Sequence, residues 1–469
     1  MKTISIIWAG AAGLMTAATI LENLDSGDFR IHVFEKNMTP GKKIILSGGW
    51  RCNLTTGIND KKILLSKYTR WADFIKKAFG KFSPGKCCEW FESHNVPLKC
   101  EKDNRVFPVS DDGYDIVEVF EKIFAKYRNR IIIHYGEGAE IISYFETDRE
   151  STPVSVIARN ESDPVTIDVA IQVSKKTENG LLRTPRVLPT LREGASSQWL
   201  IQQEWKFIIT TKKWTYDSDI VVITTGWNAY SHTGSTGDGY AFARSLGHTV
   251  TQLGPSLSSF LTSEKWIHNH SGLVFESGKI WEQKWPLLLT HFGISGPLAF
   301  MISSEVAWET IDKNHPKVIS FSPISSMGYA EWESFLKEQF VNHPKKFITN
   351  ILTEKLPKRF AEAFVREYFH SIESIYPVSI GKVARENISK LLGEGIPITL
   401  IERRPGDEFV TAGWVNTDEI DPETMESRIH KNLYFAWEVL NVDGFTGWFS
   451  LQICWASWYV AGRDIVEKI

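Results

Sequence analysis

The stretch that decides the fold is ISIIWAGAAGLM, residues 4–15. It reads as a buried strand, a turn with two glycines and the start of a helix. A dinucleotide site of the G-x-G-x-x-G type needs three glycines here: for a tight turn, for close approach of backbone to a pyrophosphate, and for close packing of helix on strand. Gly10 and Gly13 occupy the second and third places, whereas Trp8 occupies the first.

A second predicted strand follows at the spacing that such a site requires. The segment RIHVFEK, residues 30–36, carries Glu35 roughly 20 residues after the turn, where an acidic side chain accepts hydrogen bonds from a ribose. These residues predict a βαβ unit and an α/β fold. Taken alone, they leave a plain glycine-rich turn open as the alternative.

Composition describes an ordinary globular protein with no general attraction to nucleic acid. The 469 residues carry a net charge of −3, and no basic run stands out. No apolar run reaches the roughly 20 residues that span a membrane, so we expect no membrane partner. The five cysteines lack the spacing of a disulfide framework or a zinc site, which favours a cytoplasmic location and no bound metal.

The pattern along the chain predicts a divided first domain with an insertion. We expect residues 1–254 and 405–469 to form one domain, and residues 255–404, with short strands followed by amphipathic helices, to form the inserted one. Helices are expected near residues 61–82, 115–127 and from 238 onward. Residues 159–203 are polar and aperiodic, which indicates a long surface insertion.

Six ordered segments carry a family resemblance: FEKNMTPGKKIILSGGWRCNLT (34–55), RVFPVSD (105–111), SHTGSTGDGYAFA (231–243), THFGISGP (290–297), TMESRI (424–429) and LYFAWEVLNVDGFTG (433–447). Together they resemble the bacterial NAD(P)/FAD-dependent oxidoreductases of the BaiN/RdsA type, also called aminoacetone oxidase-like flavoproteins. The segment STGDGYAFA is also similar to fumarate reductase-type flavoproteins, but the other segments fit the first family better.

The resemblance implies an FAD-binding Rossmann-like fold of the two-dinucleotide-binding-domain type, with an inserted domain of β-strands and a helical part. It implies pyrophosphate at Gly10 and Gly13, adenosine ribose at Glu35, and flavin near the last helix. The implied FAD-binding residues are Gly10, Ala12, Gly13, Glu35, Lys36, Lys42, Lys43, Gly48, Arg51, Asn53, Ala139, Gly226, Asp443, Gly444, Phe445 and Gly447. NAD(P)H is the implied reductant. The small-molecule substrate, the catalytic residues and the oligomeric state stay open.

The sequence departs from the family pattern in one consistent way. Tryptophan replaces glycine at seven motif positions: Trp8, Trp50, Trp227, Trp414, Trp437, Trp448 and Trp458. Ser450 stands where the family usually has asparagine. Glycine at such places adopts positive φ or leaves room for a ligand, and an indole does neither. We therefore expect a flavoprotein scaffold whose FAD site is obstructed, with several of these indoles buried along one channel.

Two alternatives remain from the sequence. One is a working FAD oxidoreductase with shifted loops, and the other is a non-enzymatic protein that uses exposed aromatic residues for interaction. His232 and His291 lie in motif loops and HNH, residues 268–270, is expected on a strand, without the further ligands that a metal needs. Cys52 is either a redox thiol near the flavin or a small buried residue.

Overall fold

A computed structural model describes residues 1–24, 26–68, 72–147, 172–173, 186–187, 204–226, 234–369, 375–406, 408, 410–435 and 447–469. These fall into two compact units, residues 1–253 with 413–469 and residues 254–412. The predicted second boundary was after residue 404. In the structure, β20 (Val410–Ala412) pairs with β13 (Gly254–Ser256), so the strands by which the chain enters and leaves the second unit belong together.

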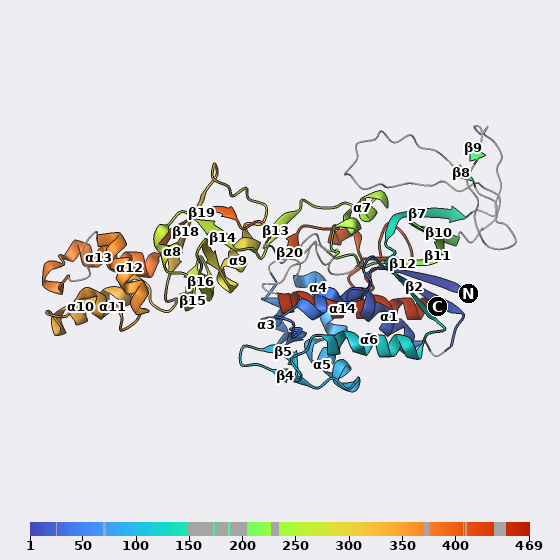
Figure 1. The fold of residues 1–469 in the computed structure, drawn as a ribbon, viewed down its shortest axis with the longest axis horizontal. Coiled ribbons are helices and arrows are strands. Elements are labelled where there is room, and N and C mark those ends of the chain that lie inside the picture. The colour runs from blue at the N-terminus through green and yellow to red at the C-terminus, as the bar shows by residue number, and fades with distance from the viewer. Residues whose placement is uncertain are drawn as a thin grey trace. The chain divides into compact units, whose positions relative to one another are not determined.

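A parallel five-stranded sheet forms the centre of the first unit (Figure 1), in the order β21-β12-β1-β2-β6. Strands from both ends of the chain share it, and the predicted Rossmann-like fold is confirmed. Residues 4–7 of β1 are buried, as expected for a strand that is covered on both faces. The strands are β1 (Lys2–Ile7), β2 (Phe29–Glu35), β6 (Ile131–Tyr135), β12 (Ile220–Ile223) and β21 (Leu433–Phe435).

Helices from the two ends of the chain pack on each other beside this sheet. Helix α1 (Ala11–Asn23) contacts α14 (Gly447–Lys468) and α6 (Tyr114–Lys126). A Cβ on Gly462 would lie 2.8 Å from Thr19 Cβ, so glycine permits the close approach of α14 to α1. The shorter helices of this unit are α2 (Lys42–Leu46), α3 (Lys61–Leu65), α4 (Ala72–Lys81), α5 (Pro84–Ser93) and α7 (Asp238–Ser245).

Smaller sheets complete the first unit. An antiparallel sheet has the order β11-β10-β7, and β11 and β10 contact β1 and β12 of the central sheet. A second small sheet has the order β3-β5-β4. The bounds are β7 (Ala139–Thr147), β10 (Glu204–Thr211), β11 (Thr215–Ser218), β3 (Thr55–Thr56), β4 (Leu98–Cys100), β5 (Arg105–Pro108), and the pair β8 (Gln172–Val173) and β9 (Arg186–Val187).

The second unit consists of a closed barrel and a helical part, in agreement with the predicted mixture of strands and helices. The barrel has the order β14-β17-β16-β15-β18-β19, and the hydrophobic core of this unit includes the fully buried Phe260, Phe321 and Trp332. The elements are β14 (Phe260–Thr262), β15 (Val274–Ile280), β16 (Gln283–Leu289), β17 (Gly293–Ser295), β18 (Lys317–Ser322), β19 (Ile396–Arg403), α8 (Lys265–Asn269), α9 (Pro297–Glu305), α10 (Tyr329–Asn342), α11 (Ile348–Leu352), α12 (Lys358–Phe369) and α13 (Lys382–Glu394).

Several local predictions can be compared with these elements. The expected helices at 115–127 and from 238 match α6 and α7, whereas the stretch 61–82 contains two helices, α3 and α4. The expectation of a strand at 268–270 is wrong. His268 lies in α8 and His270 caps it, and their rings hydrogen-bond to Thr262 O and Trp266 O. Most of the predicted insertion 159–203 lies outside the described residues.

Within the described ranges, no helix is long and apolar enough to cross a membrane.

Candidate functional site

A pocket lies at the carboxyl ends of β1 and β2, where open parallel sheets bind ligands. It holds a cavity of about 50 Å³. The first turn, the end of β2, the loop before α2, the end of β12 and the start of α14 all contribute to its lining. The lining residues are Trp8, Ala9, Gly10, Ala11, Glu35, Asn37, Gly41, Lys42, Lys43, Ile44, Thr224, Ser235 and Leu451.

Trp8 occupies the first turn with an unusual backbone. Its φ is 95°, in the region that favours glycine, and its side chain is only 6% exposed. The amide of Trp8 donates to Phe34 O at 2.8 Å, and its carbonyl accepts from Thr224 Oγ1 at 2.8 Å. These bonds tie the turn to both neighbouring strands. A left-handed conformation costs a non-glycine residue about 1–2 kcal/mol, so the surrounding contacts hold Trp8 in a strained state.

The two remaining glycines of the motif have different surroundings. A Cβ on Gly10 would meet no atom within 4 Å, whereas a Cβ on Gly13 would lie 2.0 Å from Trp8 O. Gly13 therefore has the close helix–strand contact expected of the third glycine. Gly10 caps α1 without a side-chain hydrogen bond, and the first turn of α1 contains no acidic residue. Such a helix N-terminus favours an anion. Ala12 is buried in the same turn of α1.

Glu35 lies at the end of β2, where the resemblance places a ribose. Its carboxylate already accepts three protein hydrogen bonds, from Ala9 N at 3.0 Å and from Asn37 N and Nδ2 at 2.7 Å each. The side chain is buried, and this burial raises the pKa of Glu35 above its usual value. Lys42 donates to Asn37 Oδ1 at 2.9 Å. Glu35, Asn37 and Lys42 thus form a connected polar group at the end of β2.

Lys36 links Trp8 to the start of α7. The Lys36 ammonium forms an ion pair with Asp238, donates to Thr236 Oγ1 at 3.1 Å, and lies 5.3 Å from the centroid of the Trp8 ring. A cation over an indole is a favourable contact. The resemblance assigns Lys36 to FAD, whereas here its charge is directed to a carboxylate and to the Trp8 ring.

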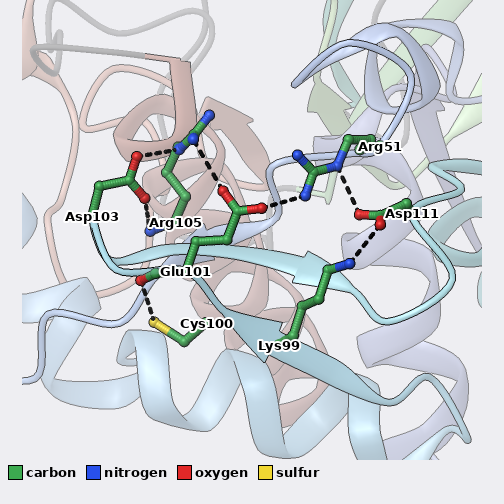
Figure 2. A network of polar contacts seen from close by, with 7 residues as sticks. All are labelled: Arg51, Lys99, Cys100, Glu101, Asp103, Arg105 and Asp111. Carbon is green, nitrogen blue, oxygen red and sulfur yellow. Dashed lines mark hydrogen bonds and ion pairs between the residues drawn. The ribbon is translucent and has the colours of Figure 1, made fainter.

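Arg51, which the resemblance implies as an FAD-binding residue, is not among the residues that line the pocket. Figure 2 shows its guanidinium between Glu101 and Asp111, at 2.5 and 2.7 Å. The same group lies 3.8 Å from the centre of the Phe107 ring. Lys99 extends this network to Asp111, and Arg105 extends it to Glu101 and Asp103. Lys99 and Arg51 together lower the pKa of Asp111.

The other predicted residues of this region have mixed placements. Lys43 lines the pocket. Gly48 has φ 61°, and a Cβ there would lie 2.8 Å from Asn53 N. Asn53 is buried, and its Oδ1 has no hydrogen-bond partner among the described residues. Burial raises the pKa of Cys52 to about 12, so its sulfur stays a thiol and the interpretation as a small buried residue is favoured over a redox thiol.

The structure describes only some of the implied FAD-binding residues that follow Asn53 in sequence. Ala139 begins β7 and is buried, and Gly226 has φ 70°. Gly447 begins α14. Asp443, Gly444 and Phe445 lie outside the described residues, as does His232.

The tryptophans at motif glycines do not share one environment. Trp414 and Trp458 are buried at 2% and 0% exposure, Trp8 is buried in the pocket, and Trp50 is 65% exposed. Trp414 packs 4.4 Å from the Tyr240 ring, and the Nε1 of Trp458 has no partner in the described part of the chain. Of these four side chains, Trp8 alone lines the pocket. Trp227, Trp437 and the side chain of Trp448 lie outside the described residues.

The exposure of Trp50 contradicts the expectation that it obstructs the site. Its loop turns outward with φ 72° after α2, and Trp50 O accepts from Gly113 N at 2.8 Å. The backbone is therefore fixed by a contact while the indole extends into solvent.

Sequence reasoning missed several pocket residues. Asn37 and Thr224 each follow a strand of the parallel sheet, and that position at a carboxyl strand end is a signal that points to them. Ser235 and Leu451 carry no such local signal. Among the described residues, no group of three or more His, Cys, Asp or Glu side chains could hold a metal ion.

Comparisons with known proteins agree with this architecture. The sequence model of the family described as HI0933-like protein Rossmann domain matches residues 2–159 and 188–464. The chain is 26% identical to a 3-dehydro-bile acid delta(4,6)-reductase of Clostridium scindens, over 100% of both chains. It is 24% identical to a ribosomal RNA dihydrouridine synthase of Escherichia coli, over 98% of this chain and 97% of that protein.

Solved structures with more distant sequences were also found. An adenosine-5-phosphosulfate reductase in complex with sulfite is 10% identical, with a TM-score of 0.38, over 99% of this chain and 69% of that one. A putative FAD containing monooxygenase from Photorhabdus luminescens is 8% identical, with a TM-score of 0.29, over 100% and 89%.

Proposed function

The chain belongs to the HI0933-like Rossmann family, which is FAD-dependent oxidoreductase-like, and from this premise we propose that it is a flavoprotein scaffold with an obstructed FAD site. FAD binding and redox activity are then lost or strongly weakened. The relatives are named for a bile acid and for ribosomal RNA, which differ too much to suggest one substrate, so the proposal names none.

The observation that carries the proposal is the position of Trp8. Trp8 lines the pocket at the first turn, where the motif needs glycine, and the cavity measures about 50 Å³. Pockets that bind drug-sized ligands measure roughly 300–1,000 Å³. The contact with Lys36, whose ammonium is paired with Asp238, holds one face of the indole. We infer that FAD could extend past the first turn only if this arrangement moved.

The residues of the pocket therefore fit the cofactor only in part. The space at Gly10 and the contact of Gly13 suit a pyrophosphate at α1. Trp8 does not suit it, because the motif needs glycine at this place. Because of this misfit we assign no redox step to the chain.

One observation favours a second candidate, a working FAD oxidoreductase reduced by NAD(P)H whose loops shift to admit the cofactor. Asn53 Oδ1 and Ser450 Oγ are buried and have no hydrogen-bond partner among the described residues. A buried polar atom without a partner costs about 1–3 kcal/mol, and a polar ligand would remove that cost. The exposed Trp50 fits the third possibility, a surface for interaction with other molecules.

The absorption spectrum of the purified protein separates the first two candidates. An obstructed site predicts protein without visible flavin bands after gel filtration. Stoichiometric flavin in the protein peak would overturn the proposal and support the working enzyme. A concentration-dependent change of mass in the flavin-free protein would instead support the interaction surface.

A further inference from the structure

A pair of histidines joins β2 to β6 on one face of the central sheet. His32 Nδ1 lies 2.9 Å from His134 Nε2, and the two rings are stacked, with centroids 5.2 Å apart and an interplanar angle of 12°. The Phe34 ring stacks on His134 at 4.8 Å. Both imidazoles are partly buried, and the pocket described above uses neither of them.

Tyr216 of β11 covers this pair from the antiparallel sheet. Its ring lies 4.9 Å from His134 and 5.7 Å from His32, measured between centroids. The Tyr216 hydroxyl donates to Glu137 Oε1 at 3.1 Å, and Thr211 Oγ1 donates to the same oxygen at 2.6 Å. Glu137 is buried. The contacts of these side chains thus connect β10 and β11 to the edge strand β6.

The histidine pair has a limited capacity for protons. In the neutral pair, one ring donates its N–H to the bare nitrogen of the other. One added proton preserves this bond, because an imidazolium can donate to a neutral imidazole. A second added proton places two N–H groups against each other and brings two positive charges together, which breaks the contact.

Burial of the two rings opposes protonation of the pair, and among the described residues only the nearby Glu137, 3.9 Å from His134 Nδ1, favours it. Burial, the neighbouring His134 and then Arg30 of β2 lower the pKa of His32 to about 4. Burial lowers the pKa of His134, although Glu137 acts in the opposite direction. Burial and Glu137 raise the pKa of Tyr216 to about 12, so its hydroxyl stays protonated as a donor. The folded state therefore favours the neutral pair.

The cluster is connected to the pocket through the backbone. Glu137 N donates to Glu35 O at 2.9 Å, and Gly136 N donates to Asn37 O at 3.1 Å. Glu35 and Asn37 line the pocket. A movement of the turn after β6 would therefore reach two pocket residues directly.

We propose that His32, His134, Glu137 and Tyr216 form a proton-sensitive latch that holds β11 and the turn after β6 against the central sheet and releases them in acid. This β11 latch works on the protein as it stands and does not depend on whether FAD binds. Its release loosens the backbone bonds to Glu35 and Asn37.

Amide hydrogen exchange at about pH 8 and about pH 3, below the lowered pKa of His32, corrected for the intrinsic effect of pH, tests the latch. In the wild-type chain we expect protection of residues 136–137 and 215–218 to fall about tenfold or more in acid. The double variant His32→Phe/His134→Phe keeps two aromatic rings that cannot be protonated, so its protection should not fall in acid. His315→Asn is the matched control, since His315 is an exposed histidine beside Asp312 of the other unit, and it should behave as the wild type.

A second measurement needs no variant and covers the case in which the double variant does not fold. Side-chain NMR of the wild-type protein should show His32 and His134 titrating in coupled steps below the usual histidine pKa. Independent titration of both rings near the ordinary value would overturn the latch. Equal protection at both pH values, or an equal loss in wild type and double variant, would also overturn it.

Discussion

Trp8 and Trp50 make the same exchange of glycine for tryptophan and have the same kind of backbone, yet they have opposite surroundings. Their φ angles are 95° and 72°, both in the left-handed region. Trp8 is 6% exposed and lines the pocket, whereas Trp50 is 65% exposed. Backbone strain is therefore common to both, whereas of the two only Trp8 lines the pocket at the first turn.

The two residues therefore separate two effects of replacing glycine by tryptophan: strain in the backbone and obstruction of the pocket. Each residue bears a conformational cost of about 1–2 kcal/mol. For Trp8, burial of a large apolar ring offsets that cost. The exposed ring of Trp50 buries little apolar surface, so it offsets little of the same cost. Under our proposal, obstruction therefore depends on where the side chain lies, and replacement of a glycine alone does not produce it.

The largest expected effect is a gain of FAD binding when all seven tryptophans are changed to glycine. Removal of the indole from the pocket and of strain from the loops should raise FAD affinity by about 1,000-fold or more, measured by titration calorimetry. The comparison predicts that a six-fold variant that keeps Trp8 stays without FAD. A folded seven-fold variant that still excludes FAD would show that the family-based assignment of the site is wrong.

Trp8→Gly alone should lower stability while leaving FAD binding weak. Loss of a buried large ring costs about 3–5 kcal/mol, and relief of the left-handed strain returns about 1–2 kcal/mol, so we expect a net loss of about 1–4 kcal/mol in chemical unfolding. Binding stays weak because the other six tryptophans still stand where the family motif has glycine along the extended ligand. A variant as stable as the wild type would indicate that the Trp8 indole packs poorly.

Trp50→Gly is the matched control and should have the opposite sign. Relief of strain at an exposed residue, reduced by the greater freedom of glycine in the unfolded chain, predicts a gain of about 0.5–1 kcal/mol. FAD binding should not change. If this variant gained FAD affinity as the seven-fold variant does, the distinction between the two tryptophans would not hold.

The pH dependence of stability should also differ between the two neighbourhoods. Burial raises the pKa of Glu35 beside Trp8, so the stability that this carboxyl contributes declines as pH rises from 4.5 toward the raised pKa. Lys99 and Arg51 lower the pKa of Asp111, so the stability that this carboxylate contributes is present above 3.8 and declines as pH falls through the lowered pKa.

Urea unfolding at a series of pH values measures these two slopes. Glu35→Gln should remove the decline of the unfolding free energy as pH rises above 4.5. Asp111→Asn should remove the decline of the unfolding free energy as pH falls below 3.8. Because Asp111 is exposed, we expect its effect to be the smallest of those described here. Curves of both variants parallel to the wild type would contradict the assignment.

Much of the fold could be predicted because it depends on local pattern. Residues that are adjacent in sequence predict each of these elements: the strand–turn–helix at 4–15, the strand that ends at Glu35, and the helices α6 and α7. The change of pattern along the chain predicted the sheet shared by both chain ends and an inserted domain of strands and helices, but not that those strands close into a barrel.

The direction of individual side chains could not be predicted in the same way. Arg51 is held by Glu101 and Asp111, which lie 50 and 60 residues away in sequence. Lys36 is paired with Asp238, 202 residues away. Tertiary packing decides which partners these side chains meet. The family motif therefore locates the backbone of Arg51 and Lys36 but does not predict their ion-pair partners. The outward turn of Trp50 has the same origin.

Equilibrium dialysis of the wild-type chain against FAD tests the central claim, that the Trp8 indole occupies the path of the dinucleotide, most directly. We predict no saturable binding up to about 1 mM FAD. Saturable binding of one FAD per chain in the micromolar range would contradict the account, because the pocket would then admit the cofactor with Trp8 in place.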